Sequence, residues 1–390
     1  MTTSTTHHES PSFELSEDLR MLRDSVRDFC ADEIAPTASK RDAEQSFPSE
    51  IMKRLAEMDL LGMLVPEEYG GTAIGNLALA IVLEELNWAD ASVGVTVSVH
   101  NSLCSSPILR FGTPELQRRY LPRLAKGEIL GAYALTEPEA GSDSANLKTR
   151  AERKGDRWVL NGTKIWITTG DYAGVMIVFA RTDPSLSKAK GITAFVVETG
   201  WKGFKVGKRE HKCGLRSSST VEIQLEDVEV PDANRLGGLN EGFKVAMDTL
   251  DGGRIGIAAQ AVGIHRACLD ASVKYAKERL QFGKPIGEFQ AIQWKIADMA
   301  TDLDAARMLV HRAAWLRDRK APCSAEAAMA KSFASRACNR AAEDAVQIHG
   351  GAGYTKDFPV ERFFRDARIT EIYEGATDIQ RLVIARSKLR

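Results

Sequence analysis

A glutamate near the C-terminus stands in an unusual place for a carboxylate. In ITEIYEGATDIQR (369–381), an apolar run that ends in Ile372 and Tyr373 leads directly into Glu374, and Gly375 follows. Glutamate is rarely buried in a folded protein unless another group pairs with it or a reaction uses it. The carboxylate is therefore either solvated at the surface or part of a functional site.

Two stretches in the middle of the chain combine residue types that bind polar or aromatic ligands. YALTEPEAGSDSANL (133–147) is dense in turn formers, and its backbone amides could bind a polar heterocycle or a carbonyl group; the alternative is an ordinary loop. In KIWITTG (164–170), Trp166 could cover an aromatic cofactor, although a tryptophan of the core fits the same pattern. Neither stretch is specific by itself.

Two later stretches suggest contacts with phosphate groups. In RLQFGKPIGEFQ (279–290), Arg279 could reach a phosphate, or it could simply be a cation at a helix C-terminus before a turn. In QIHGGAGY (347–354), Gly350 and Gly351 leave the backbone open to a ligand, or they end the preceding helix. The glycines do not form GxGxxG after a strand, so they are no Rossmann fingerprint.

The hydrophobic spacing before residue 130 predicts helices. Apolar residues recur at helical intervals over 14–35, where Pro36 is expected to close the segment, and again over 49–61 and 76–88. A further helix over 114–126 begins with a proline at its first position. The first domain is therefore expected to be helical.

The period changes after residue 130. RWVLNGTKIWITTG predicts a hairpin with an Asn-Gly turn, and three more β-branched runs follow before residue 232. Long helices are then expected over 288–319 and 323–348, with a last helix over 378–389. The predicted fold class is α+β: an N-terminal α-helical domain (1–130), a middle antiparallel β domain (131–235) and a C-terminal four-helix-bundle-type domain (236–390).

The composition excludes several classes of protein. The chain has 390 residues and a formal net charge of -1, so nothing in its charge indicates nucleic acid or an anionic membrane as a partner. No apolar run approaches the roughly 20 residues of a membrane span, and the polar start, which includes His7 and His8, resembles an exposed tail rather than a secretory signal. The six cysteines lack the spacing of zinc ligands, which predicts reduced thiols, no metal and a cytoplasmic location.

The motifs taken together resemble the acyl-CoA dehydrogenase family, over about residues 14–390. The matching stretches are YALTEPEAGSD, WIT, LDGGRIGIAAQAVG, RLQFGKPIGEFQ, QIHGGAGY and IYEGATDIQRLVIAR. The order and separation of six stretches are far more specific than any one of them, and the short-chain, or butyryl-CoA, branch is the most similar.

The resemblance implies a flavoprotein with FAD that oxidises short-chain acyl-CoA thioesters to trans-2-enoyl-CoA, a step of fatty acid β-oxidation. It also implies electron-transferring flavoprotein as electron acceptor and a homotetramer, a dimer of dimers, in which the stretches at 279–290 and 347–354 bind the FAD of a neighbouring subunit. The compartment would be the cytoplasm, or a matrix-type compartment in a eukaryote. Glu374 matches the catalytic base. The residues that match FAD contacts are Tyr133, Leu135, Thr136, Ser142, Trp166, Thr168, Arg279, Phe282, Gln290, Gln347, Gly350, Gly351, Thr377 and Gln380, and those that match substrate contacts are Ser142, Asp251, Arg254 and Gly375.

The implied chemistry explains the residues around the base. A thioester α-proton is removed only if the carbonyl oxygen receives hydrogen bonds, which the family supplies from the base residue's amide and a ribityl hydroxyl of FAD. The carboxylate must also be desolvated, and we expect Ile372 and Tyr373 to do this while Gly375 lets the amide turn inward. In the long-chain and isovaleryl branches the base lies on the helix at LDGGRIGI, where this chain has Gly253. Glu374 is therefore the candidate base.

The acyl specificity is less closely defined. The family lines its acyl pocket with the stretch VSVHNSLCSSPI (97–108), and the preceding residues Val93–Thr96 lack the cation that glutaryl-specific relatives use. This disfavours a dicarboxylyl substrate and leaves short straight and short branched chains open, since one methylene changes discrimination by only about 1–3 kcal/mol. Two hypotheses outside the dehydrogenases also stay open: an acyl-CoA oxidase that uses O2, and a catalytically silent FAD- or CoA-binding scaffold.

Overall fold

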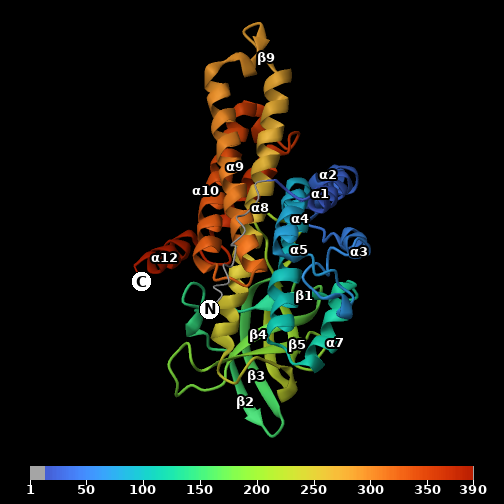
Figure 1. Ribbon diagram of the computed structural model, residues 1–390, viewed down its shortest axis with the longest axis vertical. Helices are drawn as coiled ribbons and strands as arrows, with labels where there is room; N and C mark the ends of the chain where they lie inside the picture. The colour runs from blue at the N-terminus through green and yellow to red at the C-terminus, as the bar shows by residue number, and fades with distance from the viewer. Residues whose placement is uncertain (1–13, 390) are drawn as a thin grey trace, which may run out of the picture.

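The computed structural model describes residues 14–389, so the polar start with His7 and His8 lies outside the described residues. A β-sheet lies at one end of the molecule, and long helices rise from it to the opposite end (Figure 1). Shorter N-terminal helices pack along one side of this bundle. This arrangement confirms the predicted order of helical, β and helical parts, while the exact boundaries at residues 130 and 235 stay predictions.

The N-terminal part is helical as predicted, but its first segment does not end at Pro36. The α-helix gives way to a π-helical segment, η1 (Cys30–Ile34), and Pro36 then lies in the first turn of the next helix. Proline is tolerated there because a first-turn N–H needs no partner within the helix. A second π-helical segment, η3 (Val99–Ser105), interrupts the buried helices near residue 100. The helices are α1 (Glu17–Phe29), α2 (Ala35–Glu44), α3 (Ser49–Glu57), α4 (Gly75–Ala89), α5 (Ala91–Ser98), α6 (Ser106–Phe111) and α7 (Pro114–Ala125).

The middle part is an eight-stranded sheet in the order β6-β7-β3-β2-β4-β5-β8, with β1 paired to β4. Most neighbours are antiparallel, as predicted, but β1 runs parallel to β4, with Tyr133 opposite Ile177. Parallel strands need a long connection, and here β2 and β3 supply it. The strands are β1 (Leu130–Ala134), β2 (Arg150–Lys154), β3 (Arg157–Thr168), β4 (Ala173–Arg181), β5 (Ile192–Glu198), β6 (Phe204–Arg209), β7 (Thr220–Pro231) and β8 (Arg235–Leu236).

The predicted Asn-Gly hairpin is wrong. Asn161 and Gly162 lie inside the continuous strand β3, where the pairing with β7 shifts register. The Asn161 amide donates to the Asp227 carboxylate at 3.0 Å and its oxygen accepts from the Asp227 N–H at 2.9 Å. These bonds stabilise a β-bulge rather than a turn. The chain reverses instead between β2 and β3, where Gly155 has a φ of +64°.

The C-terminal part contains three long helices that follow one another up, down and up the bundle (Figure 1). A two-stranded hairpin joins the first two at the tip, and α4 packs against α8 and α9. Two short α-helices and two short 3-10 segments follow, and the loop that leads into the last helix carries Glu374. The elements are α8 (Gly242–Glu278), β9 (Leu280–Gln281), β10 (Lys284–Pro285), α9 (Gln290–Asp318), α10 (Ser324–His349), η7 (Gly350–Tyr354), α11 (Val360–Arg368), η8 (Ile369–Glu371) and α12 (Thr377–Lys388).

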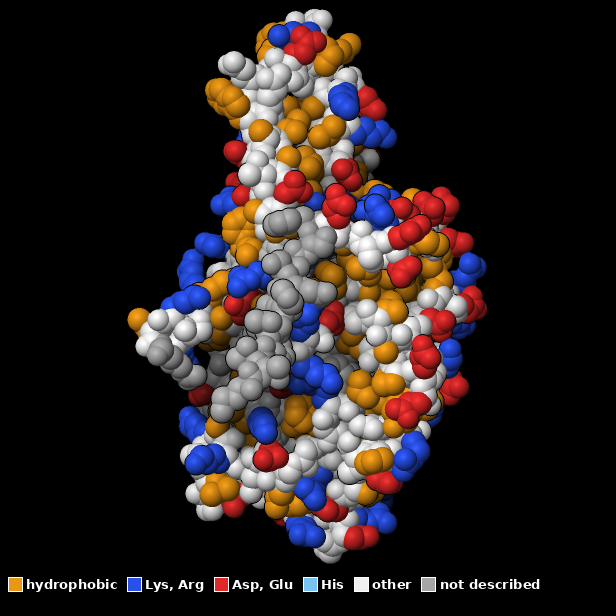
Figure 2. All heavy atoms as spheres, in the orientation of Figure 1, with side chains coloured by type: hydrophobic (Ala, Val, Ile, Leu, Met, Phe, Trp, Pro, Cys, Tyr) orange, Lys and Arg blue, Asp and Glu red, His pale blue; other side chains and the backbone are white. Residues whose placement is uncertain are grey.

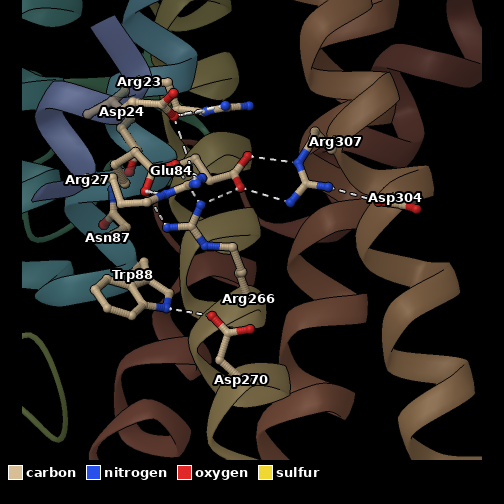
Figure 3. A network of polar contacts seen from close by, with 12 residues as sticks. Arg23, Asp24, Arg27, Glu84, Asn87, Trp88, Arg266, Asp270, Asp304 and Arg307 are labelled. Atoms are coloured by element: carbon tan, nitrogen blue, oxygen red, sulfur yellow. Dashed lines mark hydrogen bonds and ion pairs between the residues drawn. The ribbon is translucent and has the colours of Figure 1, made fainter. Parts of the chain in front are cut away.

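A buried ionic network joins the N-terminal helices to the bundle (Figure 3). Glu84 of α4 accepts from Arg266 of α8 and from Arg307 of α9, at 3.1 Å and 2.9 Å. Glu85, 1% exposed, binds Arg266 and also Arg27 of α1. Burial alone would raise the pKa of Glu84, but the guanidinium groups of Arg307 and Arg266 hold it below its usual value. The network therefore fixes four helices against one another.

Two further observations concern the chain as a whole. No helix within residues 14–389 is long and apolar enough to cross a membrane. All six cysteines fall within these residues; they form no disulfide, and five are buried while Cys213 is exposed, close to the sequence-based expectation.

Candidate active site

The loop between η8 and α12 turns sharply at Glu374. Glu374 has a φ of +51° and Gly375 a φ of +93°, so two consecutive residues are left-handed. The sequence predicted this freedom for Gly375 alone. For a residue with a side chain the conformation costs about 1–2 kcal/mol, and such strain is common at functional sites. A Cβ on Gly375 would also lie 2.5 Å from the Nε2 of Gln380, so a side chain there would have to displace the Gln380 amide.

The Glu374 carboxyl group is removed from water. Its Oε2 is buried and has no hydrogen-bond partner within residues 14–389. Burial raises the pKa of Glu374 to about 7, against the opposing effects of Lys331 and Arg254. The prediction that Ile372 and Tyr373 shield the carboxyl group is only half right, because Ile372 is 51% exposed. Tyr373 is half-buried and packs against the core, and its hydroxyl donates to the side-chain oxygen of Gln260.

The carboxyl group lies against α8 and η3. A Cβ added to Gly253 would be 2.0 Å from Glu374 Oε2 and 2.8 Å from a methyl carbon of Leu103. Leu103 belongs to the stretch 97–108 that was expected to line the acyl pocket. The absence of a side chain at Gly253 therefore leaves the space that the Glu374 carboxyl occupies.

Two cations and a tyrosine complete the surroundings of the base. Arg254 is 6% exposed and donates to Asp251 at 2.6 Å, and Asp251 in turn accepts from Ser324. Lys331 of α10 is 1% exposed and acts electrostatically on Glu374. Burial, followed by the charge of Glu374, raises the pKa of Tyr133 well above its usual value. The predicted residues Tyr133, Asp251, Arg254, Glu374 and Gly375 are thus brought together.

The predicted flavin contacts of the β part form a second group. Leu135 and Thr136 are tied to β3, because the Lys164 ammonium donates to the Leu135 carbonyl at 3.2 Å and Ile165 N–H donates to the Thr136 carbonyl at 3.0 Å. Trp166 is 56% exposed with a φ of +61°, so the core alternative is wrong. An exposed tryptophan in a strained backbone is typical of a ligand platform.

Four further predicted flavin contacts differ in how exposed their side chains are. Ser142 is exposed, and Thr168 is half-buried at the end of β3. Thr377 is half-buried and donates to the Glu371 carbonyl at 3.3 Å. Gln380 is fully buried, and its amide donates to the Gly375 carbonyl at 2.7 Å. The Gln380 amide nitrogen therefore supports the base loop, whereas its Oε1 is buried and finds no partner in the described part of the chain.

The remaining predicted FAD contacts lie at the tip of the bundle. The rings of Tyr275 and His349 stack with centroids 4.2 Å apart, so the ends of α8 and α10 are adjacent. The helical rise places this end about 39 Å from Gly253 along α8. Apolar and charged side chains lie side by side at the tip (Figure 2), and Phe282 there is 94% exposed. One chain therefore keeps the following predicted residues apart from Glu374: Arg279, Phe282, Gln290, Gln347, Gly350 and Gly351.

Comparison with known proteins shows the family of the chain. Models of the N-terminal, middle and C-terminal domains of acyl-CoA dehydrogenase match residues 16–128, 132–228 and 240–389. The chain is 49% identical over 384 residues to the mitochondrial short-chain specific acyl-CoA dehydrogenase of Mus musculus, covering 98% of this chain and 93% of that one. The chain belongs to the acyl-CoA dehydrogenase family.

Solved structures of relatives have the same fold. Butyryl-CoA dehydrogenase from Megasphaera elsdenii has a TM-score of 0.96 at 43% identity, with 97% of this chain and 100% of that one covered. A chain from a structural study of the electron transferring flavoprotein of Acidaminococcus fermentans gives the same TM-score at 47% identity, with the same coverage of both chains. The chain is therefore an FAD-dependent acyl-CoA dehydrogenase, an oxidoreductase.

The residues present fit FAD. Buried polar atoms without a partner among residues 14–389 include the Tyr133 hydroxyl and Gln380 Oε1, from two predicted flavin contacts, and Thr169 Oγ1, next to a third. At Gly350 and Gly351, no described atom lies within 4 Å of an added Cβ, which leaves the backbone open to a ligand. Both features suit a large polar cofactor.

Sequence reasoning missed Lys331. It is the one charged residue on the buried, Ala-rich face formed by Ala327, Ala330, Ala334 and Cys338 of α10, within the described chain. A lysine on an apolar face is costly unless its charge is used or satisfied. That mismatch in the pattern was the signal available in the sequence.

Proposed function

We propose that the protein dehydrogenates short-chain acyl-CoA thioesters to trans-2-enoyl-CoA, with Glu374 as the base that removes the α-proton. The observation that carries the proposal is the buried Glu374 Oε2, unpartnered within residues 14–389 beside Gly253 and Leu103. A carboxylate whose pKa is about 7 can accept a proton near neutral pH, because acid–base catalysis is most effective when the pKa is close to the working pH.

The chain's own residues have separable roles in this reaction. Arg254, held by Asp251, supplies a positive charge near the base and is proposed to hold the CoA thioester together with Ser142 and Gly375. The left-handed turn at Glu374 and Gly375 is proposed to direct the base residue's N–H towards the thioester carbonyl, where negative charge develops. FAD, when bound, accepts the hydride from the β carbon.

Two features support a short, uncharged acyl chain. The residues Val93–Thr96 are all buried and include no cation that could pair a distal carboxylate. The similarity to short-chain and butyryl-CoA dehydrogenases points the same way. A short branched acyl chain is the second candidate, since the residues named do not distinguish a methyl branch from a straight chain.

The assembly and the electron acceptor are part of the proposal. The tip residues, including Arg279 and Gly350, cannot reach the base of their own chain, so we propose that they bind FAD in a neighbouring subunit of a homotetramer. The relative from the study of electron transferring flavoprotein supports that protein as electron acceptor. Reoxidation by O2, as in an acyl-CoA oxidase, is the alternative.

An anaerobic titration of the flavin absorbance tests the function. Straight acyl-CoAs of four to eight carbons and their short branched isomers are added to the holoenzyme, and we expect the fastest and most complete bleaching with butyryl-CoA. The same mixtures are then opened to air. Bound FAD that no acyl-CoA bleaches would contradict dehydrogenation, faster bleaching by a branched substrate would favour the second candidate, and stoichiometric peroxide would favour an oxidase.

A further inference from the structure

Lys331 is a buried cation whose hydrogen bonds go to the backbone of the base loop. Its ammonium donates to the Thr370 carbonyl at 3.0 Å and to the Gly375 carbonyl at 2.9 Å. These two carbonyls lie on either side of Glu374 in the chain. Lys331 thus joins α10 to both ends of the segment that carries the base.

Each of the two carbonyls also has a neutral donor. The Ser335 hydroxyl donates to Thr370 O at 2.9 Å, and the Gln380 amide donates to Gly375 O at 2.7 Å. Neutral groups would therefore leave both carbonyls satisfied. A buried ammonium in addition is expensive to desolvate, and burial lowers the pKa of Lys331 to about 8. The positive charge of Lys331 is therefore not needed to hold the loop against α10.

The charges around Lys331 and Glu374 identify what that charge acts on. Glu374 is the first electrostatic influence on Lys331, followed by Arg254 of α8 and Glu371 of η8. Glu374 in turn interacts electrostatically with Lys331, Arg254 and the hydroxyls of Tyr133 and Tyr373. Arg254 already donates to Asp251 at 2.6 Å, whereas both hydrogen bonds of Lys331 go to neutral carbonyls. The charge of Lys331 is therefore free to act on the base.

We propose that Lys331 is a positioning residue for the base: its ammonium holds the strained turn at Glu374 from both sides and favours the ionised form of the Glu374 carboxyl. The inference rests on the proposed role of Glu374. Hydrogen bonds on both flanks oppose relaxation of the left-handed φ at Glu374, and the nearby positive charge makes the otherwise desolvated carboxylate easier to form.

The test uses the holoenzyme with the neutral variants Lys331→Met and Lys331→Gln. The first measurement is the pH profile of kcat/KM for butyryl-CoA. The second is an infrared titration of the Glu374 carboxyl, taken as the difference between each protein and its counterpart that also carries Glu374→Gln, which needs no turnover. We expect both lysine variants to move the acid limb and the carboxyl midpoint upward by about one pH unit or more, because an opposite charge at close range lowers a carboxyl pKa by about 1–3 units. This predicts a loss of about tenfold in kcat/KM on the acid side.

Ser335→Ala is the matched control, since it removes a hydrogen bond to the same Thr370 carbonyl and leaves the charge in place. Its carboxyl midpoint should stay at the parental pH. Lys331→Gln keeps a polar group in the site. If Lys331→Met does not fold with FAD, the carboxyl midpoint of Lys331→Gln therefore tests the role of Lys331. An unchanged midpoint in the folded lysine variants, while Glu374→Gln alone is inactive, would overturn the role of Lys331 only. Full turnover by Glu374→Gln would instead overturn the proposed base.

Discussion

The carboxyl group of Glu374, in the last loop, occupies the space that a side chain at Gly253 of α8 would need. An added Cβ on Gly253 would lie 2.0 Å from Glu374 Oε2, although the two residues are 121 positions apart in the chain. The resemblance to the acyl-CoA dehydrogenase family implied that other branches carry their base on this helix, at the position of the same glycine. The two possible positions for a base therefore converge on one point, and only one of them can hold a side chain.

Gly253→Ala should displace the Glu374 carboxyl without unfolding the protein. A contact of 2.0 Å cannot persist, and the side chain of Glu374 can rotate away, whereas the helix backbone cannot. We expect kcat for butyryl-CoA to fall by roughly 10²-fold, since misplacement by about 1 Å can cost that much. Steady-state kinetics and FAD absorbance measure this. Gly200→Ala is the control, because no described atom lies within 4 Å of its added Cβ, and activity lost equally in both variants would contradict the argument.

Glu374→Gln should bind FAD and acyl-CoA but turn over more slowly by about 10²–10⁴-fold or more, because the amide cannot accept the α-proton. The side chains have nearly the same size, so the left-handed turn and its contacts with Lys331 and Gln380 are retained. Single-turnover bleaching of the flavin measures the loss. Turnover at the parental rate would remove Glu374 from the mechanism.

The same variant should change how stability depends on pH. Glu374 titrates at about 7 when folded against 4.5 unfolded, so the folded state binds its proton more tightly. A raised carboxyl pKa adds stability that is fully present below about pH 4.5 and is lost as the pH rises to about 7. Relative to the parent, Glu374→Gln should therefore gain about 3 kcal/mol between these limits. Thermal unfolding at pH 4.5, 6 and 8 tests this, and a constant difference in Tm would mean that the carboxyl is not desolvated.

The order of parts followed from local patterns in the sequence, whereas the residues around the base were expected from the resemblance to the acyl-CoA dehydrogenase family. Helical periodicity placed α9 and α10 within two residues, and glycine beside Glu374 indicated the turn. The errors came from tertiary context. Asn-Gly signals a hairpin unless a partner such as Asp227 uses the asparagine side chain, as it does within β3. Pro36 closes a helix only when no new helix begins around it.

The residues that shield the Glu374 carboxyl from water could not be predicted either, because they too depend on tertiary context. Ile372 is two residues before Glu374 in the sequence but is 51% exposed, so it does not shield the carboxyl group from water. Leu103 and Lys331, which do surround the base, come from η3 and α10. Long-range packing decides which groups desolvate a carboxylate, and periodicity within one segment carries no information on it.

Glu84→Gln should destabilise the junction between α4, α8 and α9. The variant leaves Arg266 and Arg307 partly buried with one carboxylate fewer, and removal of one partner from such a network typically costs about 3–5 kcal/mol. Because the arginines lower the pKa of Glu84, its contribution is present above the unfolded pKa near 4.5 and is lost as the pH falls through the lower folded value. The difference in Tm between the variant and its parent should therefore be largest near pH 7 and shrink in acid.

Glu50→Gln is the control, since its pair with Lys53 is exposed and is expected to contribute only about 0.3–0.5 kcal/mol. Equal effects of the two substitutions on Tm at pH 7 would show that the network in Figure 3 does not hold these helices together.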